Sequence, residues 1–92
     1  MRPGLGKPLG FQQITSLSSA TGLTLPSSDA RVAIIRCTTQ NVRWRDDGTN
    51  PTASVGIPML PGDMPIAFDG DLNTIKFIEE TSGGILNVSY YS

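Results

Sequence analysis

The stretch Ala30-Arg-Val-Ala-Ile-Ile-Arg-Cys37 gives the strongest indication of the fold. Its residues Val32–Ile35 are apolar without interruption, which is typical of a strand that is buried on both faces or central in a sandwich. Further along, Asn41-Val-Arg-Trp-Arg45 alternates strictly and places Val42 and Trp44 on one face. Both patterns favour β-strands and disfavour long helices.

Tight turns separate the other candidate strands. They are predicted at Asp46-Asp47-Gly48, Asp69-Gly70 and Gly83-Gly84, because Gly tolerates positive φ and Asp caps its own backbone. Each turn is expected to join two neighbouring strands: 41–45 with 52–57, 64–68 with 72–78, and 72–78 with 85–91. The sequence therefore predicts an all-β fold, a compact antiparallel β-sandwich or small jelly-roll-like barrel of six to eight short strands.

Residues 1–12 are predicted to form a flexible N-terminal arm, and residues 13–92 a single β-sandwich domain. The arm is too rich in Gly and Pro to hold a core together. Its Leu5, Leu9 and Phe11 are spaced so that an extended chain places them on a neighbouring subunit, helped by pairing along that subunit's sheet edge. Removing the arm is expected to preserve folding and weaken attachment. The alternative is a tail that only solubilises the chain.

Composition disfavours several classes of function. Seven basic and eight acidic residues give a net charge of −1, without the clustered positive face of nucleic-acid-binding proteins. No stretch approaches the roughly 18 apolar residues of a membrane span. The chain has no histidine for a general base or a zinc site, and its single cysteine cannot form an internal disulfide. We expect no enzymatic activity, no cofactor, no nucleic-acid binding and no membrane association.

The candidate interaction residues include the densest charge cluster, which is formed by Arg43, Arg45, Asp46 and Asp47. One interpretation is an ion-pair patch between subunits. The other is a local hairpin arrangement, with the arginines on one strand face and the aspartates shaping the turn. Tyr90 and Tyr91 point to opposite faces, so we expect only one to join Trp44 inside and Tyr91 to serve an interface.

A calcium loop is a weaker possibility. Asp69, Asp71 and Asn73 alternate as in some calcium-binding loops, but the downstream glutamate and the full spacing are missing. No metal site is predicted there.

Four segments of the chain resemble small structural proteins of tailed-bacteriophage virions: Arg43-Trp-Arg-Asp-Asp-Gly-Thr-Asn-Pro-Thr-Ala-Ser-Val-Gly56, Leu60-Pro-Gly62, Asp69-Gly-Asp-Leu-Asn-Thr-Ile-Lys-Phe-Ile78 and Leu86-Asn-Val-Ser-Tyr-Tyr91. The resemblance covers residues 30–91. It implies a non-enzymatic virion subunit, with capsid decoration or cement as the favoured role. The alternative is a module of the tail, neck or fibre that binds a host-surface glycan.

The expected partners are further copies of the chain and other virion proteins. Decorations in this group often sit at three-fold positions, which implies a homotrimer that contacts the major capsid protein after assembly in the bacterial cytoplasm. A physical argument also favours self-association. So small a core gains stability from additional buried surface, and a standard interface buries about 800 Å² on each partner.

Overall fold

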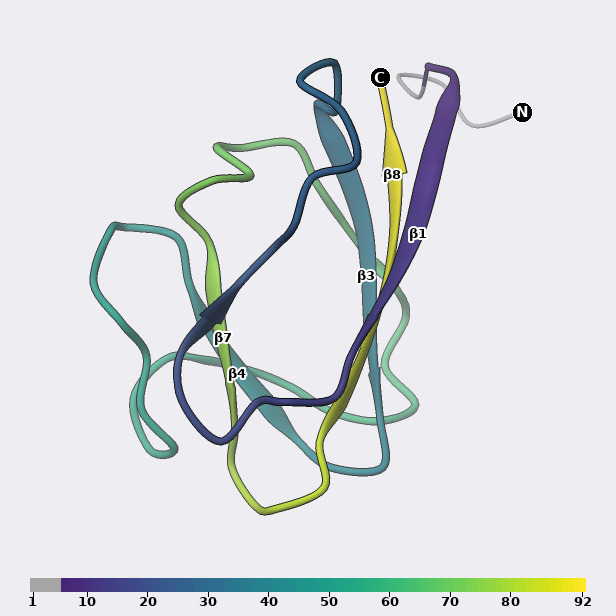
Figure 1. The fold of residues 1–92 in the computed structure, drawn as a ribbon. Coiled ribbons are helices and arrows are strands. Elements are labelled where there is room, and N and C mark those ends of the chain that lie inside the picture. Colours follow the sequence, from purple (N-terminus) through teal and green to yellow (C-terminus); the bar gives the residue numbers. More distant parts are fainter. Residues whose placement is uncertain (1–5) are drawn as a thin grey trace.

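Two four-stranded antiparallel sheets face each other in the computed structural model, which describes residues 6–92 (Figure 1). The first sheet has the order β1 (Pro8–Ile14), β8 (Ile85–Tyr91), β3 (Val32–Thr38), β6 (Ile66–Phe68). The second has the order β2 (Thr21–Gly22), β7 (Lys76–Glu79), β4 (Val42–Arg45), β5 (Ile57–Met59). No helix occurs within residues 6–92, and the predicted all-β sandwich is confirmed.

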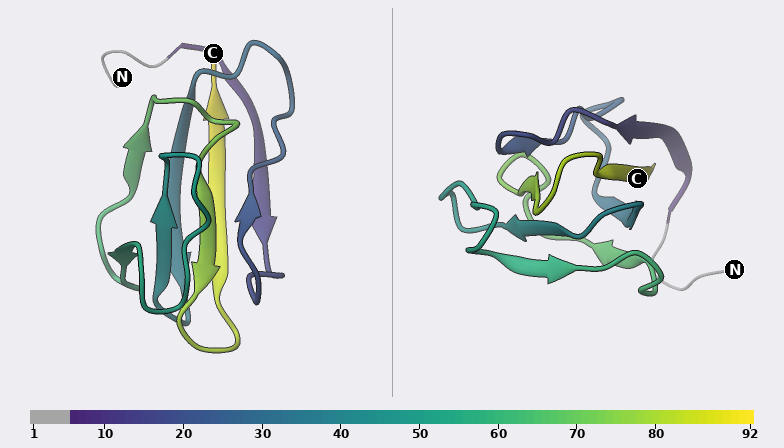
Figure 2. Two further views of the ribbon diagram at one scale, coloured as in Figure 1. Left: turned by 90° about the vertical axis from the view of Figure 1, so that its left-hand side faces the viewer. Right: turned by 90° about the horizontal axis from the view of Figure 1, so that it is seen from below.

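The order of the strands is that of a jelly roll. β1 pairs with β8, β2 with β7, β3 with β6 and β4 with β5, all antiparallel. Such pairs arise when one long antiparallel ribbon, closed at its β4–β5 end, is rolled so that alternate pairs fall into opposite sheets. Figure 2 shows the result in its left view: β1 and β2 lie at one margin of the sandwich, β5 and β6 at the other.

Only one of the three predicted hairpins lies within a sheet. The Asp46-Asp47-Gly48 turn joins β4 to β5, and the φ of Gly48 is 85°, in the region that favours glycine. The turns at 69–70 and 83–84 instead connect strands of opposite sheets. The two hairpins predicted there are therefore wrong, because turn residues favour a reversal of the chain without determining which sheet receives the next strand.

The return strand after β4 begins later than predicted. Residues 52–55 form a turn in which Thr52 and Val55 exchange backbone hydrogen bonds of 2.9 and 3.2 Å. β5 then runs from Ile57 to Met59 with Pro58 at its centre. Proline has no N–H to donate, which suits an edge strand.

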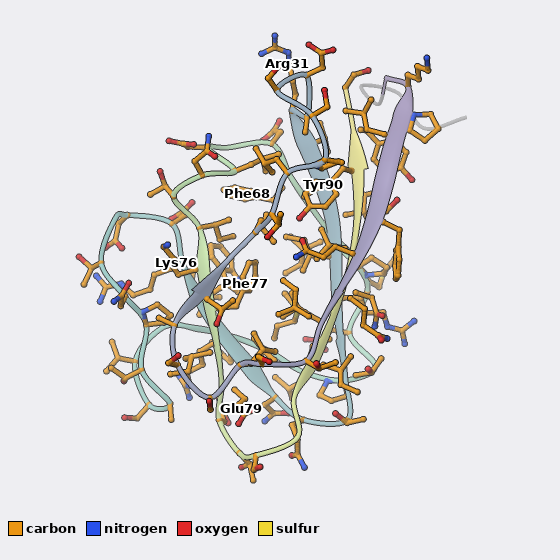
Figure 3. The ribbon with its side chains drawn as sticks, in the orientation of Figure 1. Arg31, Phe68, Lys76, Phe77, Glu79 and Tyr90 are labelled. Carbon is orange, nitrogen blue, oxygen red and sulfur yellow. The ribbon has the colours of Figure 1, made fainter. Side chains whose placement is uncertain are left out.

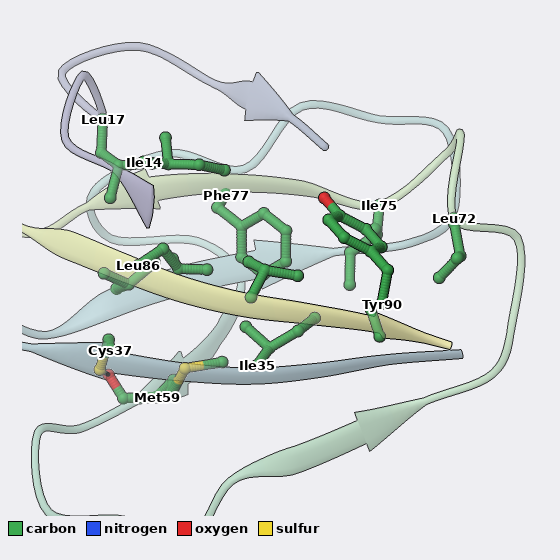
Figure 4. Close-up of a cluster of buried hydrophobic side chains, with 13 residues drawn as sticks. Ile14, Leu17, Ile35, Cys37, Met59, Leu72, Ile75, Phe77, Leu86 and Tyr90 are labelled. Atoms are coloured by element: carbon green, nitrogen blue, oxygen red, sulfur yellow. Dashed lines mark hydrogen bonds between the residues drawn. The ribbon is translucent and has the colours of Figure 1, made fainter. Parts of the chain in front are cut away.

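The core lies between the sheets (Figures 3 and 4). Figure 3 shows Phe77 and Tyr90 pointing inward, whereas Lys76 points away. The predicted common face of Leu86, Val88 and Tyr90 is confirmed, because all three are buried. The buried cluster, most of which Figure 4 labels, consists of Ile14, Leu17, Ala33, Ile35, Cys37, Val42, Met59, Leu72, Ile75, Phe77, Leu86, Val88 and Tyr90.

β1 contradicts the predicted boundary of the N-terminal arm at residue 12. Pro8–Ile14 is a strand of the domain, paired along β8 from Gly10 opposite Tyr90 to Ile14 opposite Leu86. The expected sheet edge exists, but it belongs to the same chain. Pairing through the main chain requires no large side chains, so a segment rich in Gly and Pro can form it.

One half-buried amide, that of Gln12, helps to hold β1 in place. The Tyr90 hydroxyl donates a hydrogen bond of 2.6 Å to Gln12 Oε1, which also accepts the Thr24 N–H at 3.2 Å. Burial raises the pKa of Tyr90 to about 12, because the phenolate would lose its hydration between the sheets. Gln12 thus connects the first strand, the last strand and the segment that precedes β3.

Candidate interaction surface

The predicted charge cluster separates into two ion pairs. Arg45 and Asp47 form a two-point contact, with Nη2–Oδ2 at 2.5 Å and Nε–Oδ1 at 3.1 Å. The hydrogen bond from Arg45 lowers the pKa of Asp47, and the same bond raises the pKa of Arg45. Asp46 has no ion-pair partner among residues 6–92. These contacts fit the local hairpin arrangement.

Arg43 contacts Glu80, which no pattern in the sequence singled out as a candidate site residue. Its Nε donates to Glu80 Oε2 at 2.7 Å, and its Nη1 donates to the Gly56 carbonyl oxygen at 3.0 Å. The guanidinium thereby links β4, the start of β5 and the connection that follows β7. Glu80 lies diagonally across from Arg43 in the β4–β7 pair, but those strands are distant in sequence, so no local pattern indicates the contact.

A hollow of about 400 Å³ lies where β4 leaves the sheet and β5 returns, and we call it the β4–β5 hollow. Its lining residues are Trp44, Arg45, Asp46, Asp47, Val55, Gly56 and Ile57. Trp44 is half-buried and packs edge-to-face on Phe68, with ring centroids 6.2 Å apart. Val55 and Ile57 remain 52% and 53% exposed. The hollow is therefore lined by both apolar and charged residues.

Exposed apolar side chains concentrate in the same part of the chain. Within residues 6–92 the large exposed ones are Phe11, Val55, Ile57, Leu60 and Met64. Four of these five lie in the segment 55–64, which we call the β5 margin. Residues 48–62 also carry no charge. Exposed apolar groups together with depleted charge are typical of protein–protein contact surfaces.

The predicted contact residues of β1 and β8 differ in their exposure to solvent. Phe11 is 66% exposed and lies on the outer face of β1, opposite Ser89. Leu9 is half-buried and packs against the core, and Leu5 lies outside the described residues. Tyr91 is buried like Tyr90, which contradicts the expectation that only one of them is buried. β8 is an interior strand, so Tyr91 has neighbours on both β1 and β3.

A second hollow, of about 580 Å³, is polar. It lies at one end of the sandwich and is lined by Leu25, Ser27, Ser28, Ala30, Arg31, Asp69, Gly70, Asp71, Leu72 and Asn73. The Asp71 carboxylate accepts hydrogen bonds from Thr74 Oγ1 at 2.7 Å and from the Asn73 N–H at 2.9 Å, and the Thr74 bond above all lowers its pKa. Asp71 thus holds a turn.

Two searches of the described residues gave negative results. Residues 6–92 contain no group of three or more His, Cys, Asp or Glu side chains placed to hold a metal ion. The same range has no helix with the length and apolar character needed to cross a membrane.

The single cysteine is part of the core. Cys37 is buried, its Sγ donates to the Met59 carbonyl oxygen at 3.3 Å, and burial raises the pKa of its thiol. It fills space between the sheets as a small apolar side chain does.

Comparison with protein-family models, with curated proteins and with solved structures finds no match to this chain.

Proposed function

We propose that this protein is a non-enzymatic structural subunit of a tailed-bacteriophage virion, and specifically a decoration or cement subunit that stabilises the head. The observation that carries the proposal is a jelly roll with its exposed apolar side chains gathered at the β5 margin. Jelly rolls recur in viral capsid proteins, as well as in lectins and cupins. The fold alone does not distinguish among these functions, so the choice depends on the surface of the molecule.

The β5 margin fits a subunit that functions when docked. The margin exposes the apolar side chains of Val55, Ile57, Leu60 and Met64. Exposing this apolar surface to water does not stabilise a monomer. Seating this margin on a capsid protein or on another copy removes that surface from water, and each square ångström contributes about 25 cal/mol. A homotrimer on the particle, assembled in the bacterial cytoplasm, uses such contacts.

The engaged carboxylates favour a structural role over an enzymatic one. Asp47 and Glu80 are in ion pairs, and Asp71 holds a turn. The chain has no histidine to act as a general base near neutral pH.

The alternative role is a module of the tail, neck or fibre that binds a host-surface glycan. The observation that favours it is the polar hollow, whose Ser28, Arg31 and Asn73 provide hydrogen-bonding groups for sugar hydroxyls. Its lining residues include no aromatic side chain on which a sugar ring stacks. A glycan array with the purified protein tests this alternative, and specific retention of a host-surface glycan would favour it over decoration.

The test of the main proposal is cryo-electron microscopy of the virion whose genome contains this sequence, with and without the gene. We expect jelly-roll density on the outside of the head that disappears in the deletion particle and returns when purified protein is added. Deletion heads should also break at a lower temperature than complete heads. Density only on the tail or fibre would favour the alternative role, and absence from the particle would overturn both.

A further inference from the structure

We propose that copies of this chain associate head to tail, with Phe11 of one copy seated in the β4–β5 hollow of the next. This contact deepens the self-association included in the proposed function and rests on that part of it. Heterologous contacts of this kind use two different surfaces on each copy, so every subunit has one of each to offer.

Phe11 has the properties of an anchor side chain. It is 66% exposed on an edge strand, although the strand is already held by its pairing with β8 and by Gln12. Its neighbours on the outer face, Gln13 and Ser89, are small or uncharged. An exposed aromatic ring surrounded by uncharged groups loses little hydration when a partner covers it, and such residues dominate interface energies.

The β4–β5 hollow has the properties of a receptor for that ring. Its volume of about 400 Å³ falls within the range of roughly 300–1,000 Å³ that is typical of ligand clefts, so a benzyl group has room to enter. Trp44, Val55 and Ile57 supply the apolar wall, and the exposed halves of the two aliphatic side chains are left for a partner to cover. The charged lining residues are Arg45, Asp46 and Asp47.

The two surfaces cannot meet within one molecule. Phe11 lies on β1, at one margin of the first sheet, and the hollow lies at β4 and β5, at the other margin of the second sheet (Figure 2). Each copy can therefore use both surfaces at once. The assembly becomes a ring where the rotation between neighbours closes, and a chain where it does not.

The charges of the two surfaces are complementary. The strands of the first sheet, β1, β8, β3 and β6, contain a single charged residue, Arg36, and so carry a net charge of +1. The lining of the hollow contains Arg45, Asp46 and Asp47, a net charge of −1. Arg36 points outward from β3, two strands away from Phe11 and one row of outward residues along the sheet. Opposite net charges favour contact between these two different surfaces over contact between two identical ones.

Two variants that each lack one half of the contact provide the test. Phe11→Ser removes the anchor, and Ile57→Glu blocks the hollow with a charge. Sedimentation velocity is measured on the full chain at micromolar to millimolar concentration. We expect the unaltered protein to form assemblies larger than dimers, and each variant to self-associate about tenfold more weakly or worse. An equimolar mixture of the two variants retains one intact contact, so it should form a dimer and nothing larger.

Matched controls and contrary outcomes complete the test. Met64→Ser removes the most exposed apolar side chain, at 85%, outside the hollow, and Gln13→Ala changes the outer face of β1; both should assemble normally. Circular dichroism verifies that every variant is folded. If Phe11→Ser assembles as well as the unaltered chain, or the mixture gives no dimer, the contact is wrong while self-association stands. A chain that stays monomeric at every concentration overturns both, and leaves the virion role to cryo-electron microscopy.

Discussion

The two margins of the sandwich are built from segments of similar composition that reach opposite states. β1 (Pro8–Ile14) and the β5 margin (55–64) are both rich in Gly or Pro; β1 carries no charge and the β5 margin only that of Asp63. β1 is paired along the whole length of β8 and is connected through Gln12 to the buried Tyr90 hydroxyl. The β5 margin includes a strand of only three residues and exposes most of its apolar side chains.

The difference teaches what a Gly- and Pro-rich segment needs in order to join a domain. Composition limits side-chain burial, but it leaves the main chain free to pair with an available strand edge. β1 has such an edge in β8 and one well-placed polar side chain. The apolar side chains at the β5 margin extend beyond the opposing sheet, and their burial requires another molecule.

The largest effect is expected from removing residues 1–12. This truncation exposes the edge of β8 and deprives the Tyr90 hydroxyl of its acceptor, so we expect a loss of at least about 4 kcal/mol in unfolding free energy, or failure to fold. Urea denaturation followed by circular dichroism measures it. An unchanged midpoint would mean that residues 8–12 are an arm after all.

A matched pair of substitutions isolates the contribution of the half-buried Gln12 amide of β1. Gln12→Ala leaves the Tyr90 hydroxyl and the Thr24 N–H without their acceptor, which should cost about 2 kcal/mol in unfolding free energy. Gln13→Ala loses only an exposed contact with Asn87 and should change stability by less than about 0.5 kcal/mol. Equal effects of the two changes in thermal or urea unfolding would contradict the role given to Gln12.

The raised pKa of Tyr90 predicts a dependence of stability on alkaline pH. The folded value of about 12 exceeds the value of about 10 for an exposed tyrosine, so the neutral hydroxyl is favoured in the folded state. Its contribution is complete below pH 10 and is lost as the pH rises from 10 to 12. Urea midpoints across this range should fall more steeply for the unaltered protein than for Tyr90→Phe. Parallel curves would show that Tyr90 titrates normally.

Substitutions of the two arginines of β4 should differ modestly in their effect on stability. Arg43→Ala removes a half-buried ion pair with Glu80 and the bond to the Gly56 carbonyl, and should cost about 1–2 kcal/mol. Arg45→Ala removes a more exposed pair with Asp47 and should cost less than Arg43→Ala does. Thermal unfolding at low and high salt compares the stabilities of the two variants. A larger loss of stability for Arg45→Ala than for Arg43→Ala would contradict this ranking.

A small effect on the stability of the monomer is expected from Ile57→Ser. Its side chain is half exposed at the β5 margin, so the change should alter the unfolding free energy by less than about 1 kcal/mol. Urea unfolding at concentrations low enough to prevent assembly measures this. A core-like loss of about 2 kcal/mol or more would place Ile57 within the core.

The sequence allowed the faces of the long strands to be predicted, because alternation reports directly on burial. Val88 and Phe77 are buried where alternation placed them. The sequence did not indicate which of the two sheets each strand joins, because a Gly-bearing turn has the same sequence pattern whether it connects strands of one sheet or of both. β1 was missed because its partners are 72 to 83 residues away. In the candidate surface, Glu80 escaped notice for the same reason, while the exposure of Phe11 was anticipated.

Amide hydrogen exchange, measured by mass spectrometry on dilute monomer and on concentrated protein, tests the contrast between the two margins most directly. The account predicts that the amides of β1 are protected in both samples, since their pairing with β8 lies within one chain. The amides of residues 55–57 should gain protection only in the concentrated sample. Rapid exchange of β1 in the monomer, with residues 55–57 unchanged on assembly, would contradict the account at both margins.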